Sequence, residues 1–247
     1  MAVQVGRFQL FAIGIDKVTM AEAVSRCLAF IASGRPHMVV TPNAEIAYAA
    51  ADNPALAELI NKADLVIPDG AGVVLASRIL GDPVPEKVAG TDLATNLLAE
   101  LNKTGGRVFL LGTKPDVVAK AAANLRATYP GLGAVEYHHG FWKPEDEPAL
   151  IQQIRSARPD VLYVALGSPR QEQWIRAHQA AVGAPLAIGV GGTIDVWAGV
   201  AQRAPEWMIK RNLEWLFRVV KFGRYGRSLP PLMKFVGKVA RLRLLRR

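Results

Sequence analysis

The sequence is poor in cysteine, with a single thiol, Cys27, among 247 residues. One cysteine excludes an internal disulfide framework and is typical of a protein kept in a reducing compartment. Cys27 lies within an amphipathic helical pattern, so we expect a buried structural thiol and not a reactive one.

Long apolar runs are also absent. No stretch approaches the roughly 18 consecutive apolar residues that a membrane-spanning helix requires. The apolar stretch that follows Arg7 is short and ends at Asp16, which does not resemble a secretory signal. We therefore expect a cytoplasmic protein.

Two nucleotide fingerprints and a common metal motif are missing. Neither G-x-G-x-x-G nor G-x-x-x-x-G-K-[ST] occurs, and the first absence disfavours a nicotinamide-dependent oxidoreductase. Many nucleotide-sugar enzymes hold a divalent cation between two nearby aspartates, yet the chain has no Asp-x-Asp. The acidic cluster 145–147 is better explained as a solvated helix start. His138 and His139 are adjacent, so on a strand their rings would point to opposite faces. We expect no metal and no cofactor.

What the chain has in abundance is positive charge at one end. The formal net charge is +9, and residues 203–247 contain 13 Lys or Arg against two Glu, which leaves residues 1–202 slightly acidic. Such asymmetry calls for an anionic partner at the C-terminus: nucleic acid, acidic lipid headgroups or a diphosphate substrate.

Short β-branched runs alternate with longer helical patterns along residues 1–202. This alternation predicts an α/β fold, a Rossmann-like and mostly parallel sheet covered by helices on both faces. The expected strands are 37–40, 65–67, 108–111, 135–137, 161–166 and 186–190. Thr19 and Glu22 fit a capping box at the start of a helix that reaches about residue 31.

The character of the sequence changes near residue 203. We expect a catalytic domain over residues 1–202 and a basic, amphipathic, membrane-associating helical appendage over residues 203–247. Within the appendage the pattern predicts a helix over 206–221, a break over 223–231 that contains Pro230 and Pro231, and a second helix over 232–247.

Glycines follow several of the expected strands. Gly112, Gly167, Gly191 and Gly192 occupy turns at the carboxyl edge of the sheet, where ligands of such sheets bind. Backbone amides at the following helix N-termini would suit a diphosphate. Each glycine taken singly is explained as well by a tight turn, but together they favour a nucleotide-diphosphate site.

Asp69 is the strongest candidate for chemistry. It follows the apolar run 65–68 and precedes Gly70, so it is expected at the end of a strand, facing the ligand edge. A carboxylate there can take a proton from a hydroxyl that attacks a sugar carbon. An N-cap for the helix beginning near Ala71 explains the same residue equally well.

The basic appendage allows three interpretations. It could be a solvated helix face, a nucleic-acid site or a membrane anchor. Its basic residues alternate with Leu, Val, Phe and Met at helical spacing, and not with exposed stacking aromatics. We therefore favour an anionic membrane surface over nucleic acid. An apolar tail helix could equally pack on a sister subunit, so a homo-oligomer stays open.

Several separated motifs occur in an order that resembles the WecG/TagA/CpsF glycosyltransferases over about residues 8–228. They are Thr-Pro-Asn-Ala-Glu at 41–45, Pro-Asp-Gly at 68–70, Glu-Lys-Val-Ala-Gly-Thr-Asp-Leu at 86–93, His-His-Gly-Phe at 138–141, Leu-Gly-Ser-Pro-Arg-Gln-Glu at 166–172, Gly191-Gly192 through Asp195 to Gly199, and Arg-Ala-Pro at 203–205 leading to Leu-Glu-Trp-Leu at 213–216.

This resemblance implies an inverting, metal-independent transfer of a hexose from a UDP-sugar to a sugar linked to polyprenyl diphosphate, on the cytoplasmic face of the membrane. The hexose would be of the N-acetylmannosamine type, its uronic acid or glucose, and the product would serve teichoic acid or other cell-surface polysaccharide synthesis. The family implies Asp69 as the catalytic base. The substrate-binding residues that it implies are Thr41, Asn43, Ser168, Arg170, Gln171 and Asp195, with Arg203, Arg211, Arg218 and Arg224 supplied by the appendage.

One position departs from the family pattern. Lys87 stands where many relatives have Arg, and an ammonium group cannot make a bidentate contact to a phosphate. A phosphate contact at Lys87 is therefore expected to be weaker or differently aimed. The alternative function is a nucleotide-binding module without turnover, docked to membrane or RNA by its basic tail.

Overall fold

A six-stranded, wholly parallel sheet forms the centre of the computed structural model, which describes residues 6–211, 213–221 and 225–245. The strand order is β4-β3-β8-β7-β5-β6. The strands are β3 (His37–Val40), β4 (Leu65–Val66), β5 (Arg107–Gly112), β6 (Ala134–His138), β7 (Val161–Ala165) and β8 (Leu186–Gly189). All six lie where the sequence predicts them, and the predicted α/β, Rossmann-like class is confirmed.

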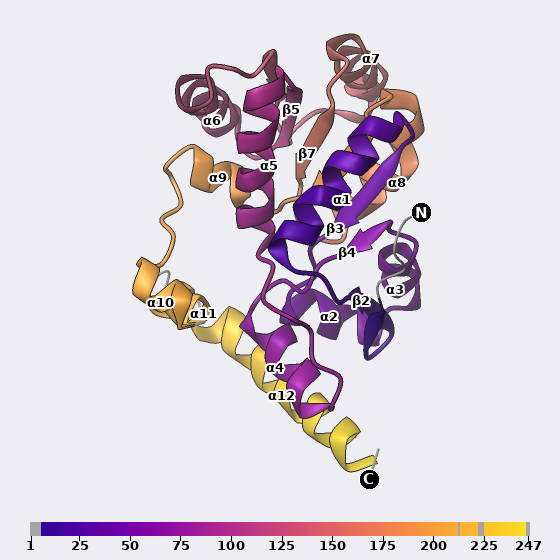
Figure 1. Cartoon of the computed structure of the whole chain (residues 1–247), viewed down its shortest axis with the longest axis vertical. Helices are drawn as coiled ribbons and strands as arrows, with labels where there is room; N and C mark the ends of the chain where they lie inside the picture. The colour runs from indigo at the N-terminus through magenta and orange to yellow at the C-terminus, as the bar shows by residue number, and fades with distance from the viewer. Residues whose placement is uncertain (1–5, 212, 222–224, 246–247) are drawn as a thin grey trace.

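Helices cover both faces of the sheet, and each face has its own apolar core (Figure 1). One core is built with α2 (Ala44–Ala51), α3 (Pro54–Asn61), α4 (Ala71–Ile79), α7 (Glu147–Ala157) and α8 (Arg170–Val182). The other is built with α1 (Met20–Ser33), α5 (Gly90–Thr104), α6 (Pro115–Thr128) and α9 (Thr193–Trp197). A single 3₁₀ turn, η1 (Pro144–Asp146), precedes α7. The core strands are buried on both sides, which explains their continuous apolar runs.

The helix starts follow local chemistry. The Thr19 hydroxyl accepts a hydrogen bond from the Glu22 amide at 3.2 Å, and the Glu22 carboxylate accepts from the Thr19 amide at 2.7 Å. The predicted capping box at the start of α1 is therefore confirmed. The Asn43 side chain caps α2 in the same way, because its Oδ1 accepts from the Ile46 amide at 3.0 Å.

A two-stranded antiparallel hairpin, not expected from the sequence, precedes α1. It consists of β1 (Arg7–Leu10) and β2 (Ile13–Asp16), and its turn places Phe11 at a positive φ of 53°. The Asp16 carboxylate accepts hydrogen bonds from the Arg7 side chain and from the Val66 amide at 2.7 Å. These bonds tie the hairpin to the edge strand of the sheet.

The C-terminal segment differs from its prediction. The expected helix over 206–221 is two helices, α10 (Glu206–Lys210) and α11 (Glu214–Lys221), and the Leu213 amide donates to the Met208 carbonyl at the break between them. The expected break over 223–231 is wrong from residue 225 onward, because α12 (Tyr225–Leu245) runs through both prolines.

Helix α12 lies along α2 and α4 at one end of the molecule (Figure 1). Phe235 and Val239 are 2% exposed and belong to the same apolar core as the hairpin and α4. The Phe235 ring meets Phe11 edge-on at 5.6 Å between centroids. Lys238 pairs with Asp52 at 2.6 Å. In the part of the chain that the structure describes, no helix is both long and apolar enough to cross a membrane.

Candidate active site

Asp69 lies at the carboxyl end of β4, in the turn that leads into α4. Its amide donates to the Ile67 carbonyl at 3.0 Å, and its side chain is half-buried. The N-cap of α4 is Gly70, with φ of 83° and no side chain, so the alternative in which Asp69 occupies the cap position is wrong. The sharp turn at Gly70 carries the chain past Asn43, whose Cβ lies 3.8 Å from where a Gly70 Cβ would stand.

Thr41 and Asn43 follow the neighbouring strand β3, beside the Asp69 turn. The Thr41 hydroxyl is buried and donates to the Gly189 carbonyl at 3.0 Å, which joins the ends of β3 and β8. A Cβ at Gly90 would lie 3.0 Å from the Thr41 side chain, so the start of α5 packs closely on it. The sheet therefore brings Thr41, Asn43 and Asp69 to one edge.

The connections that leave β3 and β8 diverge at this edge. From β3 the chain turns to β4 at the border of the sheet, whereas from β8 it enters α9, which packs on α6. Neighbouring strands with diverging connections form a topological switch point, the usual ligand site of such sheets. Thr41 and the turn 190–192 lie at this point.

Arg203 comes to the same region from the segment after α9. Its guanidinium makes a two-pronged ion pair with the Asp92 carboxylate near the start of α5, with 3.2 Å between Nη2 and Oδ2. Burial lowers the pKa of Arg203, but the Asp92 hydrogen bond and the nearby carboxylates of Asp92, Glu214 and Asp69 raise that pKa above its usual value overall. The guanidinium and the Asp69 carboxylate thus belong to one electrostatic cluster.

The glycine turns lie on the other side of the switch point. Gly112 ends β5 with φ of 138°, and a Cβ there would stand 2.3 Å from the Ala165 carbonyl oxygen of β7, so only glycine fits. Thr113 follows at a positive φ of 49°, and its hydroxyl donates to the Asp195 carboxylate at 2.6 Å. Asp195 is therefore fixed at the end of β5 by a residue 82 positions away.

Gln171 and Glu172 form a buried polar network behind the turns of β7 and β8. Gln171 Nε2 donates to Glu172 Oε1 at 2.7 Å, and the Gly191 amide donates to Gln171 Oε1 at 3.2 Å. Burial raises the pKa of the Glu172 carboxyl, although hydrogen bonds from Gln171, its own amide and Ser168 oppose the shift. Glu172 Oε2 has no partner among the described atoms.

A hydroxyl pair connects the two sides of the site. The Thr91 and Thr193 hydroxyl groups lie 2.9 Å apart, which joins the N-terminus of α5 to that of α9. The contacts of Thr91, Asp92, Thr113, Thr193 and Glu172 were not anticipated from the sequence. All five occur within the family motifs or beside a glycine named above, which was the available signal.

The remaining candidates are more scattered. Ser168 and Arg170 are exposed at the start of α8, and the Arg170 guanidinium lies 5.2 Å from the Trp142 ring centroid. Lys87 is half-buried shortly before α5, and Arg211 is exposed after α10. The Arg218 side chain and all of Arg224 lie outside the described residues. Gly167 and Gly192 occupy the turns after β7 and β8.

The adjacent histidines correct one expectation. His138 ends β6 and His139 follows it, and their ring centroids are 4.4 Å apart, so the rings do not point to opposite faces. The His138 Nδ1 atom contacts the His139 carbonyl at 2.9 Å. Within the described ranges, no three His, Cys, Asp or Glu side chains are grouped closely enough to hold a metal ion.

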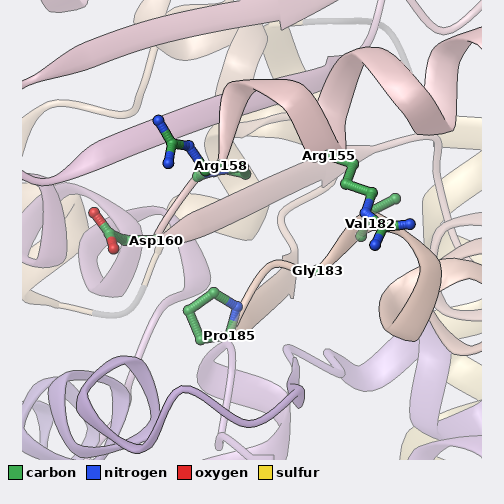
Figure 2. Close-up of a pocket in the computed structure, with 7 residues that line it drawn as sticks. Arg155, Arg158, Asp160, Val182, Gly183 and Pro185 are labelled. Carbon is green, nitrogen blue, oxygen red and sulfur yellow. The ribbon is translucent and has the colours of Figure 1, made fainter.

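A separate hollow of about 410 Å³ lies at the opposite, amino-terminal edge of the sheet (Figure 2). Arg155 and Arg158 lie along its upper side in this view, with Asp160 at the left and Gly183 and Pro185 below. Helices α7 and α8 end there, so the arginines are suitably placed to offset the helix dipoles. None of the candidate residues lines this hollow, and we assign it no part in the site.

Comparison with known proteins identifies the family of the chain. The glycosyl transferase WecG/TagA/CpsF family model matches residues 8–247. The chain belongs to this family. Among its relatives is a protein of Staphylococcus aureus strain NCTC 8325 / PS 47, 34% identical over 240 residues, which span 95% of this chain and 94% of that protein. A Bacillus spizizenii relative is 34% identical over 201 residues, or 81% of this chain and 77% of that protein.

Both relatives are named N-acetylglucosaminyldiphosphoundecaprenol N-acetyl-beta-D-mannosaminyltransferase. The WecG/TagA/CpsF match covers the α/β body and continues through α10, α11 and α12. The chain is thus a glycosyltransferase, and the carboxyl edge of its sheet, with Asp69, Asn43 and Asp195, is the candidate active site.

Proposed function

We propose that this glycosyltransferase moves an N-acetylmannosamine-type hexose from a UDP-sugar to a sugar linked to polyprenyl diphosphate, with inversion at the anomeric carbon. The observation that carries the proposal is Asp69, a carboxylate at a strand end beside Asn43 and within the field of Arg203. The names of the relatives support the lipid-diphosphate acceptor. UDP-sugars that carry glucose or the uronic acid of N-acetylmannosamine are the alternative donors to be compared with it.

The chemistry is a single displacement. The Asp69 carboxylate takes the proton of the acceptor hydroxyl while that oxygen forms a bond to the anomeric carbon. The bond from that carbon to the UDP oxygen breaks, and UDP leaves with the electron pair. Attack from the face opposite UDP inverts the configuration.

The departing diphosphate needs positive charge or hydrogen-bond donors. We propose that backbone amides of the turns at Gly112, Gly167 and Gly192 supply donors, since the Gly191 amide already donates to Gln171, and that arginines of the appendage supply charge. In this proposal the transfer needs no metal ion, since the sequence lacks Asp-x-Asp.

The site residues divide into two groups in this proposal. Asn43, Lys87, Arg203 and Arg211 act near the acceptor and the diphosphate, together with Arg218 and Arg224. Ser168, Arg170, Gln171, Gly192 and Asp195 act on the nucleotide side. Thr41 has a structural role between the two groups. Its hydroxyl donates a hydrogen bond to the Gly189 carbonyl and so holds the ends of β3 and β8 together.

We further propose that residues 203–247 hold the enzyme on the inner face of the plasma membrane. The segment carries 13 Lys or Arg, and each one near an anionic surface contributes about 1 kcal/mol. Residues 1–202 would then be the catalytic domain and 203–247 the membrane-associating appendage.

The decisive experiment measures UDP release from a panel of UDP-sugars, with and without a lipid-diphosphate N-acetylglucosamine acceptor. We expect acceptor-dependent release with UDP-N-acetylmannosamine, unchanged by EDTA, and a product of inverted configuration by NMR. Binding of UDP without release from any donor would favour the non-catalytic module instead. If EDTA abolished the release of UDP, the proposed metal independence would be wrong, but the proposed transfer reaction would stand.

A further inference from the structure

Helix α4 of the α/β body has an apolar stripe that no described element covers. Leu75 is 54% exposed and Ile79 is 37% exposed. They lie three and seven residues after Gly72, so they share one side of the helix with it. Gly72 is the point at which α4 meets α12, because a Cβ there would stand 3.6 Å from the Phe235 ring. The stripe therefore borders α12.

Helix α12 has a matching stripe. Met233, Val236, Ala240 and Leu244 are all exposed and are spaced by three and four residues, whereas Phe235 and Val239 face the core. The α4 side of α12 is marked by Arg243, whose Nη1 would be 3.5 Å from a Cβ at Gly81. Val236 precedes Arg243 by seven residues and so lies on that same side. Lys238 points to the other side, to Asp52.

The two stripes adjoin where the helices meet, and Figure 1 shows α4 and α12 side by side. We call this surface the α4–α12 seam and define it by six residues: Leu75, Ile79, Met233, Val236, Ala240 and Leu244. Its surroundings are basic. Arg78, Lys234 and Arg241 are exposed, and neither helix contains an Asp or Glu.

We propose that the α4–α12 seam inserts into the headgroup layer of an anionic bilayer, so that the catalytic body itself, and not the basic tail alone, contacts lipid. An apolar stripe with a basic border and no carboxylate on either of its helices has the charge and polarity that such a surface binds. The inference deepens the proposed function and rests on its lipid-linked acceptor.

The location of the seam has a consequence for catalysis. Helix α4 begins two residues after Asp69, and Leu75 lies about one turn into it, roughly 6 Å from the first residue. A seam in the headgroup layer would thus hold the Asp69 turn at the level where a lipid-linked diphosphate projects from the bilayer.

An environment-sensitive fluorophore on an introduced cysteine tests the seam. Cys27 is fully buried, so a maleimide labels only the new thiol. We expect NBD on Leu75→Cys to shift to the blue with phosphatidylglycerol vesicles. NBD on Val200→Cys is the matched control, since Val200 is 53% exposed beyond α9, and it should not shift.

A label on Met233→Cys distinguishes lipid contact by α12 from lipid contact by α4. A shift at residue 233 without one at residue 75 would show that the tail binds alone and would overturn the seam. Self-association that buries residue 75 without vesicles, detected by sedimentation velocity, would assign the surface to a second copy of the chain.

Partition measurements give an independent result. Leu75→Ser should bind the same vesicles about tenfold more weakly, and Val200→Ser should bind as the wild type does. Equal binding by both variants contradicts the proposal. Transfer by the wild-type enzyme to a water-soluble short-chain acceptor is measured alongside. If no transfer occurs, the proposed function is wrong. If transfer occurs but the label at residue 75 shows no shift, only the proposal for the α4–α12 seam is wrong.

Discussion

At the scale of single residues, the candidate site combines half-buried polar groups with fully buried polar groups behind them. Asp69 and Asn43 are half-buried and lie at strand ends, whereas Gln171 and Glu172 are buried behind the glycine turns. The Gly191 amide donates a hydrogen bond to Gln171, which in turn donates to Glu172. The position of the turn after β8 therefore depends on these buried side chains.

Glu172 gives a prediction about pH. Burial raises its pKa in the folded state, so ionisation costs more free energy in the folded than in the unfolded chain. The folded protein therefore loses stability as the pH rises through the raised pKa. Glu172→Gln cannot ionise, and its stability relative to the wild type should increase from pH 5 to pH 8 in urea unfolding. Exposed Glu145→Gln is the control. A pH-independent difference would contradict the assignment.

At the scale of elements, an ion pair fixes the segment that follows α9. Arg203 and Asp92 are 111 positions apart, and the pair joins this segment to the start of α5. Both side chains are partly exposed, at 28% and 32%, so the pair contributes only about 0–1 kcal/mol to stability. Its main effect is on where the guanidinium stands relative to Asp69.

Asp92→Asn should consequently lower kcat/KM by about tenfold while the Tm changes by no more than a few degrees. Glu100→Gln is the matched control, since it removes an exposed partner of Lys103 far from the site. Steady-state kinetics and calorimetry on both variants provide the test. A large loss of Tm without a change in kcat/KM would show that the pair serves folding alone.

Helix α12 depends on Phe235. This ring is buried against Phe11, so Phe235→Ala should cost about 3–5 kcal/mol of docking free energy. We expect faster hydrogen exchange in residues 232–245 and along α4, with the central strands unaffected. Met233→Ala, at 72% exposure, should exchange as the wild type does. Uniform acceleration in every strand would indicate global unfolding instead.

Five of the six strands were predictable because each is a short apolar run that ends in a small or polar turn, a pattern produced by burial on both faces. The edge strand β6 contains Glu136 and is only partly buried. The hairpin was not predicted, since β1 alternates exposed and buried residues instead of forming a continuous apolar run, and the turn contains a positive-φ Phe11. Pro230 and Pro231 predicted a break, yet helix α12 continues through them. Packing of Phe235 and Val239 outweighs that local preference.

The site was predictable in part. Parallel strands bring their carboxyl ends together, so the proximity of Thr41, Asn43 and Asp69 followed from the strand pattern alone. The pairs Arg203–Asp92 and Thr113–Asp195 did not, because nothing in local sequence indicates contacts across 111 and 82 residues. Only the folded chain shows them.

At the scale of the whole molecule, the charge asymmetry becomes a spatial one. The basic C-terminal helix lies along α2 and α4 at one end, and the sheet with its glycine turns occupies the rest (Figure 1). One end of the molecule is thus suited to an anionic surface while the Asp69 turn lies beside that end.

Transfer to a long-chain lipid acceptor in phosphatidylglycerol vesicles should fall several-fold as NaCl rises from 50 to 500 mM, because salt screens exposed charges. Transfer to a short-chain soluble acceptor should change far less over the same range. Equal salt sensitivity with the two acceptors would mean that salt acts on the active site and not on membrane attachment.

The most direct test of the central claim is the kinetics and UDP affinity of Asp69→Asn. The amide has the size of the carboxylate but cannot accept the acceptor proton. We predict a 100- to 10,000-fold lower kcat. The Kd for UDP, measured by calorimetry, should stay within about twofold of the wild-type value. The control variant Asp116→Asn should keep the wild-type kcat and the wild-type Kd for UDP. A kcat near the wild-type value, or a loss of UDP affinity as large as the loss of kcat, would contradict Asp69 as the base.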